Sequence, residues 1–282
     1  MAKERRLATV VGAVLGMVFA LLVAVAEGRA QVTDEFHQVY ALNPSGRVEL
    51  KNINGDVHIT AWDRNEVKVD AVKRAGTKQR LDEAKIVVEA NRDSIMIKTD
   101  YPQHELTFTT GDMNNPASVE YTLTVPRGAR LERIELVNGG LDIAGVTGDV
   151  RASCVNGALR ARDLQGEARL STVNNHVEAS FTRMPTSRIA LKSVNGTVEL
   201  TIPSDANAEV TAKTVNGSID NDFGLHVHHG RYVGHDLRGQ IGRGGPEIEL
   251  ENVNGTIDIR HASDGRPMSP AKSLSGDDDD DI

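Results

Sequence analysis

The segment 137–175, VNGGLDIAGVTGDVRASCVNGALRARDLQGEARLSTVNN, decides the fold class of this chain. Val-Asn-Gly occurs in it twice, eighteen residues apart, and Val-Asn-Asn follows after another eighteen. Gly148 and Gly166 lie halfway between these marks, so a turn recurs about every nine residues. Turns at a fixed step predict a repeat architecture in which each unit stacks on its neighbour.

The same turn motif occurs seven times, and an Ile or a Val precedes every copy. The copies are Asn54-Gly55, Asn138-Gly139, Asn156-Gly157, the degenerate Asn174-Asn175, Asn195-Gly196, Asn216-Gly217 and Asn254-Gly255. The steps between them are close to whole numbers of coils of 18–21 residues. Because each coil is expected to stack directly on the preceding one, the asparagines should lie above one another at one corner. Their side-chain amides should then form a hydrogen-bonded ladder.

The residues around each turn alternate between apolar and polar. The clearest examples are Val57-His58-Ile59, Leu141-Asp142-Ile143, Leu159-Arg160-Ala161, Val198-Glu199-Leu200 and Ile257-Asp258-Ile259. A period of two indicates strands with one buried face. We therefore predict an all-β fold, a β-solenoid of stacked 18–21-residue coils. Asn-Gly between alternating runs is also a strong hairpin signal, so an antiparallel β-meander or sandwich is the alternative.

Composition and charge narrow the possible functions. Hydrophobic residues make up 39% of the chain but aromatic residues only 4%, which suits a core of small side chains between stacked strands. The net charge is −8 and no basic stripe is present, so nucleic-acid binding is not expected. The single cysteine, Cys154, is expected to be a small buried side chain without a disulfide partner.

The first thirty residues have the pattern of a signal peptide. Lys3, Arg5 and Arg6 precede the apolar segment 7–26, and small residues at 28 and 30 place the mature start at Gln31. The apolar segment is also long enough to span a bilayer, so an uncleaved N-terminal anchor is the alternative, with membrane contact only through residues 7–26. After it we expect an N-terminal β region over 31–135, sandwich-like in part, and regular coils over 136–262. A disordered acidic tail should follow over 263–282.

The stretch 52–57, NINGDV, followed by ITAWDRNEV at 59–67, resembles the opening of the bacterial "putative adhesin" family, a domain of unknown function with β-strand repeats. The later Val-Asn-Gly copies and GRGGPEIEL at 242–250 are similar to the body and the last coil of that family. The resemblance covers residues 48–259. It implies a right-handed β-helix-like fold, a periplasmic, cell-surface or secreted location, and no established activity or catalytic residues.

Two groups of side chains are candidate ligand sites. His226 and His228 share a strand face and are weak metal candidates, although a solvated loop is the alternative. Arg151 and Arg169 should stack on one face and could bind an anionic glycan or phosphate. The other face should carry Arg160 with Asp142, Glu178, Glu199, Asp220 and Asp258. A solvated face of mixed charge is the alternative for both rows.

The sequence contains no GxSxG, HExxH or phosphate-loop motif, and we predict a protein that is not an enzyme and uses no cofactor. The predicted function is an exported adhesin-like binding or scaffold module, with envelope polysaccharide or another envelope protein as its partner. One alternative is a β-helix polysaccharide lyase or hydrolase, which would need paired carboxylates on one face. Another is a sensor or regulator of envelope stress. The end coils would expose strand edges, so dimerisation by edge pairing is an option.

Overall fold

The computed structural model describes residues 31–101, 117–230 and 234–274. The signal peptide or anchor predicted at 1–30 and the aspartate run 277–281 lie outside the described residues. Residues Gln31–Ile282 form one compact unit. Its buried cluster extends from Leu42 to Ile259. Because this unit contains its own hydrophobic core, we expect it to fold without residues 1–30.

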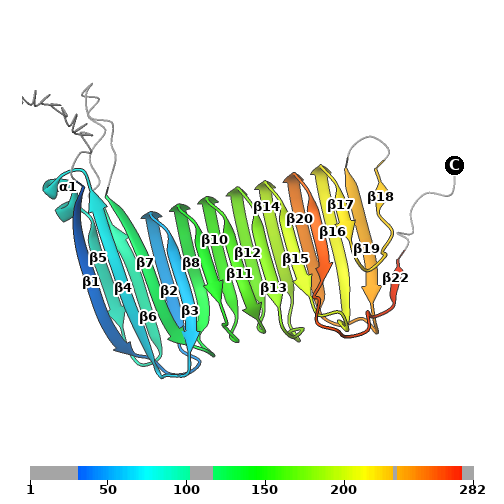
Figure 1. The fold of residues 1–282 in the computed structure, drawn as a ribbon, viewed down its shortest axis with the longest axis horizontal. Helices are drawn as coiled ribbons and strands as arrows, with labels where there is room; N and C mark the ends of the chain where they lie inside the picture. The colour runs from blue at the N-terminus through cyan, green and yellow to red at the C-terminus, as the bar shows by residue number, and fades with distance from the viewer. Residues whose placement is uncertain (1–30, 102–116, 231–233, 275–282) are drawn as a thin grey trace, which may run out of the picture. The chain divides into compact units, whose positions relative to one another are not determined.

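The described residues form two β-sheets, here called sheet A and sheet B (Figure 1). Sheet A contains, in spatial order, β1 (Val32–Ala41), β4 (Glu66–Ala75), β7 (Ser118–Pro126), β3 (Val57–Trp62), β9 (Leu141–Ala144), β11 (Leu159–Leu164), β13 (Val177–Phe181), β15 (Val198–Ile202), β21 (Ile257–His261) and β17 (Ile219–Asn221). Sheet B contains β18 (His228–His229), β19 (His235–Ile241), β16 (Ala208–Asn216), β20 (Glu247–Asn254), β14 (Ile189–Asn195), β12 (Ala168–Asn174), β10 (Val150–Asn156), β8 (Arg130–Asn138), β2 (Arg47–Asn54), β6 (Ser94–Asp100) and β5 (Lys85–Ala90), with β22 (Ala271–Ser273) paired to β19.

A short helix, α1 (Lys78–Glu83), connects β4 to β5. It begins after Thr77, whose hydroxyl accepts a hydrogen bond from the Arg80 amide at 3.3 Å, as an N-cap does. Within the described residues, no helix has both the length and the apolar character needed to cross a bilayer.

Each regular coil contributes one strand to each sheet, and the asparagine motif makes the turn between them. Strand β10, for example, pairs in parallel with β8 and with β12, and Asn156 lies in register with Asn138 and Asn174. Strands joined by a hairpin would pair with each other, whereas these pair with the equivalent strands of neighbouring coils. The prediction of an all-β solenoid of stacked coils is therefore confirmed, and the meander alternative is wrong for these coils.

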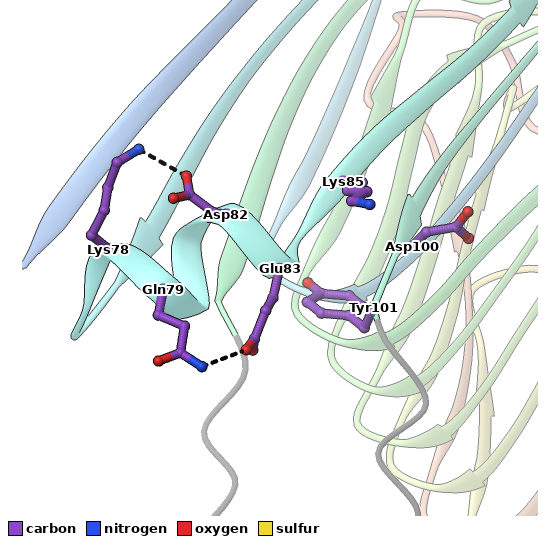
Figure 2. Close-up of a pocket in the computed structure, with 7 residues that line it drawn as sticks. All are labelled: Lys78, Gln79, Asp82, Glu83, Lys85, Asp100 and Tyr101. Carbon is purple, nitrogen blue, oxygen red and sulfur yellow. Dashed lines mark hydrogen bonds and ion pairs between the residues drawn. The ribbon is translucent and has the colours of Figure 1, made fainter.

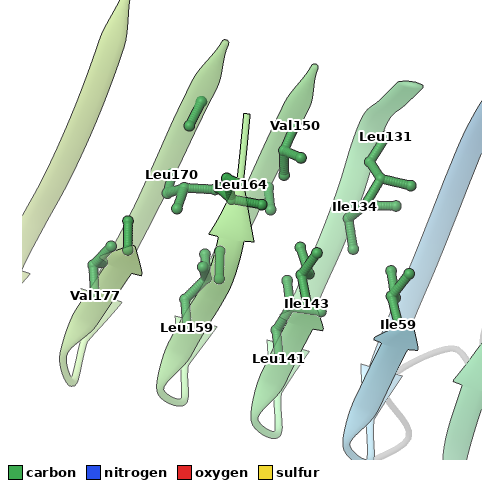
Figure 3. Packing of buried hydrophobic residues seen from close by; sticks show 14 of the residues in the cluster. Ile59, Leu131, Ile134, Leu141, Ile143, Val150, Leu159, Leu164, Leu170 and Val177 are labelled. Atoms are coloured by element: carbon green, nitrogen blue, oxygen red, sulfur yellow. The ribbon is translucent and has the colours of Figure 1, made fainter. Parts of the chain in front are cut away.

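The core fills the space between the two sheets (Figure 3). Leu141, Leu159 and Val177 lie in register on adjacent coils, and all three are fully buried. Since these inward side chains pack on their equivalents in the next coil, this part of the core is a set of aliphatic columns. Truncating one member such as Leu159 to alanine is expected to cost about 2–5 kcal/mol.

The order of the coils in space differs from their order in the chain at both ends of the stack. The coil β20–β21 lies between β14–β15 and β16–β17, and the coil β2–β3 lies between β6–β7 and β8–β9. The expectation that each coil stacks on the preceding one is wrong here. Equal spacing of a motif defines the size of a coil, but it does not define which neighbour the coil pairs with.

Antiparallel strands complete both ends. Strands β1 and β4 extend sheet A beyond β7, and β5 extends sheet B beyond β6. At the other end β19 pairs with β16, and both β18 and β22 pair with β19. The strands described within 31–101 and 117–135 therefore belong to the same two sheets as the later coils. Residues 271–273, which lie in the tail that was expected to be disordered, form strand β22.

Candidate functional site: the outer face of sheet B

The seven asparagines of the turn motif form a ladder at one corner of the solenoid. The Nδ2 of each donates to the Oδ1 of its neighbour at 2.8–3.0 Å. In space the order is Asn54, Asn138, Asn156, Asn174, Asn195, Asn254, Asn216. The residue that follows has a positive φ in six of the seven turns, including 115° at Asn175, where the motif lacks glycine. The degenerate copy therefore has the same backbone as the others.

An exposed apolar column runs beside the ladder, on the outer face of sheet B. It consists of the residue before each ladder asparagine and is here called the valine stripe: Ile53, Val137, Val155, Val173, Val194, Val253 and Val215. Each of these side chains is 39–48% exposed. At a spacing of about 4.8 Å between strands, the stripe is roughly 30 Å long. A contiguous exposed apolar surface of this kind indicates an interaction site.

A second column, the polar row, lies two residues before the stripe in each strand. Its members in spatial order are Lys51, Glu135, Ser153, Ser171, Lys192, Glu251, Lys213 and, from β19, Asp236. Neighbouring members pair within the chain, at 2.9 Å between Lys51 and Glu135 and at 2.8 Å between Lys192 and Glu251. The row thus alternates in charge towards its ends and has hydroxyl groups near its middle.

The C-terminal half of this face is hollowed into a groove of about 1140 Å³. The stripe and the polar row from β10 to β16 line it, together with Leu274 and parts of β18 and β19. Two ring nitrogens in its wall, Nε2 of His228 and Nδ1 of His235, are buried without a hydrogen-bond partner among the described residues. The groove combines an apolar floor with polar edges, which is the usual character of a binding surface.

A third column, not predicted from the sequence, lies inside the turns. The residue two positions before the ladder asparagine is polar in six of seven coils, and its side chain donates to a backbone carbonyl at a turn position. These bonds run from Asn52 to Val119 and Gly55, Cys154 to Gly139, Thr172 to Gly157, Ser193 to Asn175, Asn252 to Gly196 and Thr214 to Gly255, at 2.6–3.2 Å. The signal for it was the recurring small polar residue before Val-Asn-Gly.

Cys154 belongs to this inner column. Its Sγ lies 3.2 Å from the Gly139 carbonyl oxygen, in the position that a hydroxyl occupies in Thr172. Burial raises the pKa of the Cys154 thiol, which keeps it protonated at neutral pH and a weak nucleophile. Its place in the fold is therefore structural.

Arg151 and Arg169 lie in register on the outer face of sheet B. Both guanidinium groups contact Oε1 of Glu167, at 3.6 Å and 2.7 Å. An anionic ligand at this pair would compete with that carboxylate. The pair is thus a partly neutralised site rather than an open anion clamp.

The opposite charged column lies on the outer face of sheet A. In spatial order it contains His58, Asp142, Arg160, Glu178, Glu199, Asp258 and Asp220. Arg160 and Arg162 pair with Glu178 at 3.5 Å and 3.3 Å, and Arg260 pairs with Asp258 at 2.9 Å. Arg151 and Arg169 therefore lie on the outer face of sheet B, and Arg160 lies with the acidic residues on the outer face of sheet A, as the alternation predicts.

The histidines of the 222–235 segment contact one another. The rings of His226 and His228 meet edge to face at 4.9 Å between centroids, and those of His229 and His235 at 4.6 Å. Across residues 31–101, 117–230 and 234–274, no group of three or more His, Cys, Asp or Glu side chains is placed to hold a metal ion. The structure therefore adds no ligands to the pair His226 and His228.

A smaller hollow, of about 860 Å³, lies beside α1 (Figure 2). Its polar side chains pair locally, with Lys78 donating to Asp82 at 2.8 Å and Gln79 donating to Glu83 at 3.3 Å. Tyr101 closes one side and donates to the Ala117 carbonyl at 2.8 Å, and burial raises the pKa of its phenol to about 12. These groups belong to the end of the stack, and we assign no site to them.

Residues 152–260 match the family model described as Toastrack DUF4097. Over this segment the chain is similar to the Toastrack family. The match runs from β10 to β21 and includes the ladder and the stripe over those coils. The resemblance to an adhesin-like domain of unknown function is confirmed over this segment.

Three solved structures with low sequence identity are similar to this chain. A "putative cell adhesion protein" from Clostridium sporogenes is 13% identical, covers 81% of this chain and 100% of its own, and has a TM-score of 0.45. A "putative adhesin" from Bacteroides fragilis is 12% identical, with coverages of 81% and 97% and a TM-score of 0.37. A "putative lipid binding protein" from Parabacteroides distasonis is 11% identical, with coverages of 82% and 97% and a TM-score of 0.28. No curated protein matches the chain.

Proposed function

We propose that this protein is an exported, non-catalytic binding or scaffold module of the cell envelope or cell surface, and that it interacts through the outer face of sheet B. The valine stripe carries this proposal. Seven aliphatic side chains, each 39–48% exposed, lie in one column on a scaffold held in register by the asparagine ladder. A solenoid presents such a column as an extended, rigid surface, which suits polymers and proteins as partners.

Export is supported by the pattern of the first thirty residues, in which Lys3, Arg5 and Arg6 precede an apolar segment and small residues. The partner is envelope polysaccharide or an envelope protein. A partner with apolar groups at a regular spacing would match the stripe, since exposed valines offer area but no hydrogen bonds.

The polysaccharide lyase or hydrolase remains the alternative from another class of function. Glu178, Glu199 and Asp258 lie on adjacent coils of sheet A, which places their strands about 4.8 Å apart. Arginines pair with Glu178 and Asp258 at 3.5 Å and 2.9 Å. An acid or base in catalysis must reach the substrate, so carboxylates held in ion pairs within the chain favour a structural role for this column.

Retention on immobilised material tests the proposal. The panel consists of envelope polysaccharides, an envelope protein fraction and the chain itself, and new reducing or unsaturated ends are scored in the same samples. Residues 31–282 would be compared with Val173→Lys in the stripe and with Val39→Lys, an exposed valine of β1 outside the stripe. We expect retention by one class of material, its loss in Val173→Lys but not in Val39→Lys, and no new ends. Retention that is equal in all three proteins would contradict the site, and new ends would contradict the non-catalytic function.

A further inference from the structure

We propose that the occupant of the outer face of sheet B is a second copy of this chain. The two copies form an isologous dimer whose two-fold axis is parallel to the strands and passes between β12 and β14. The inference rests on the proposed function, because it names the partner of the same face.

The symmetry explains why the stripe is a straight column. A two-fold axis parallel to the strands places one sheet face on the other, keeps the strand direction and reverses the order of the coils. Each row then faces the same row of the second copy, and stripe packs on stripe. Val173 opposes Val194 of the second copy, Val155 opposes Val253, and Val137 opposes Val215, so six of the seven stripe residues lose their exposure to water.

The polar row is complementary to itself under this operation. The opposed pairs are Lys51 with Asp236, Glu135 with Lys213, Ser153 with Glu251, and Ser171 with Lys192, each formed twice. Two of these pairs join opposite charges, and the other two join a hydroxyl with a charge. Complementary charges across an interface define the register and disfavour other arrangements.

A third row of outward-facing residues, two positions before the polar row in the coil strands, is complementary to itself in the same way. In spatial order it contains Glu49, Arg133, Arg151, Arg169, Ala190, Glu249, Thr211 and Arg238. The same axis opposes Glu49 with Arg238, Arg133 with Thr211, Arg151 with Glu249, and Arg169 with Ala190. Neither row brings like charges together.

Other positions of the two-fold axis close to this one bring like charges into opposition. Moving the axis onto β12 opposes Glu135 with Glu251, and moving it onto β14 opposes Glu135 with Asp236. Moving it between β10 and β12 opposes Arg151 with Arg169. Like charges in direct opposition are unfavourable, so the charge pattern selects the axis between β12 and β14.

The area is sufficient for a stable dimer. Eight strands at about 4.8 Å give a length of about 38 Å, and three outward rows give a width of about 18 Å. Each copy would therefore bury roughly 700 Å², or about 1,400 Å² in total, within the range of specific protein interfaces. An apolar column flanked by charged rows has the anatomy expected of such an interface.

Cross-linking between single cysteines tests the register. Val173→Cys and Val194→Cys, each made in a Cys154→Ser background, would be mixed and treated with a short bismaleimide. We expect cross-linked dimers from this mixture. Val137→Cys mixed with Val155→Cys is the matched control, because these positions would lie about 19 Å apart along the stack and should not react. Products from the control pair and not from the first pair would overturn the register. Valine to cysteine is a small change, so this test does not depend on a disruptive variant.

Sedimentation equilibrium of residues 31–282 tests the dimer itself. We expect a dimer in the micromolar range, at least about tenfold weaker association for Val173→Lys, and unchanged association for Val39→Lys. A monomeric wild-type protein that gives no cross-links would overturn the inference. If retention on polysaccharide or on the envelope protein fraction still depended on Val173 in that case, the proposed function would stand with a different partner. If neither self-association nor retention depended on Val173, both proposals would fail.

Discussion

Replacing Asn156 with alanine tests whether the ladder holds the coils together. Asn156 donates to Asn138 at 2.8 Å and accepts from Asn174 at 2.8 Å, so the substitution removes two hydrogen bonds from the middle of the ladder. A typical intramolecular hydrogen bond contributes about 0.5–1.5 kcal/mol to stability. The ladder lies at an exposed corner, where water replaces part of what is lost. We therefore expect the free energy of unfolding to fall by about 1–2 kcal/mol.

The end of the ladder supplies an internal scale. Asn216 lies at one end and takes part in a single ladder bond, which it donates to Asn254 at 2.9 Å, so Asn216→Ala should cost about half as much as Asn156→Ala. Asn65 is exposed and lies outside the ladder, and Asn65→Ala should stay within about 0.5 kcal/mol of the wild type.

Urea unfolding of residues 31–282 measures these differences. A changed midpoint with an unchanged m-value reports stability alone, and the expected loss for Asn156→Ala corresponds to a fall in melting temperature of about 2–8 °C. Equal losses for Asn156→Ala and Asn216→Ala, or no loss for either, would refute the additive ladder. A changed m-value would show instead that the coils no longer unfold together.

Three further predictions concern other parts of the molecule. In Gly157→Ala the new Cβ would meet the Gly139 carbonyl oxygen of the next coil, so thermal unfolding should show a loss of about 3 kcal/mol or more, or no folded protein. Thr172→Val removes the hydroxyl that donates to Gly157 at 3.1 Å and should cost about 1–3 kcal/mol by urea unfolding, whereas Thr172→Ser should be nearly neutral. The hydrogen bond that Nδ1 of His37 donates to Oδ1 of Asp70 raises the pKa of His37 above 6.5, so this contact between β1 and β4 is fully present below pH 6.5 and is lost as pH rises through the raised value. An NMR titration should show that pKa, and Asp70→Asn should lower it towards 6.5.

The sequence was sufficient to predict the coil but not the order of the coils. The period of the Val-Asn-Gly motif and the alternation around it are local properties, and each coil repeats them, so the corner position of the asparagines follows from the sequence. Which coil pairs with which is a long-range choice. The coils at 208–221 and 247–261 both carry apolar residues at equivalent inward positions, Val210 with Ile248 and Ile219 with Ile257, so the local pattern does not define which of them packs against β14–β15. The insertion 222–246 makes the exchange possible, because it is long enough to form β18 and β19 and return.

The candidate site was missed for a different reason. Each valine of the stripe precedes an asparagine in a strand, and a single exposed valine has no functional meaning. Only the stacking in register turns seven such residues into one surface. The Arg151 and Arg169 pair shows the converse, since the sequence predicted their register but could not show that Glu167 contacts both guanidinium groups.

The stripe is not required by the fold. Outward positions in the other two rows of sheet B carry Lys, Glu, Ser, Arg, Thr and Ala, and those residues lie in the same strands at the same spacing. Strand formation therefore tolerates polar side chains on this face, and threonine would satisfy β-propensity at the stripe as well as valine does. An exposed aliphatic column favours aggregation when it has no partner. The chain nevertheless has Ile or Val at all seven positions, next to rows whose charges are self-complementary. The economical explanation is that this face is covered in the working protein and that its partner has the same pattern.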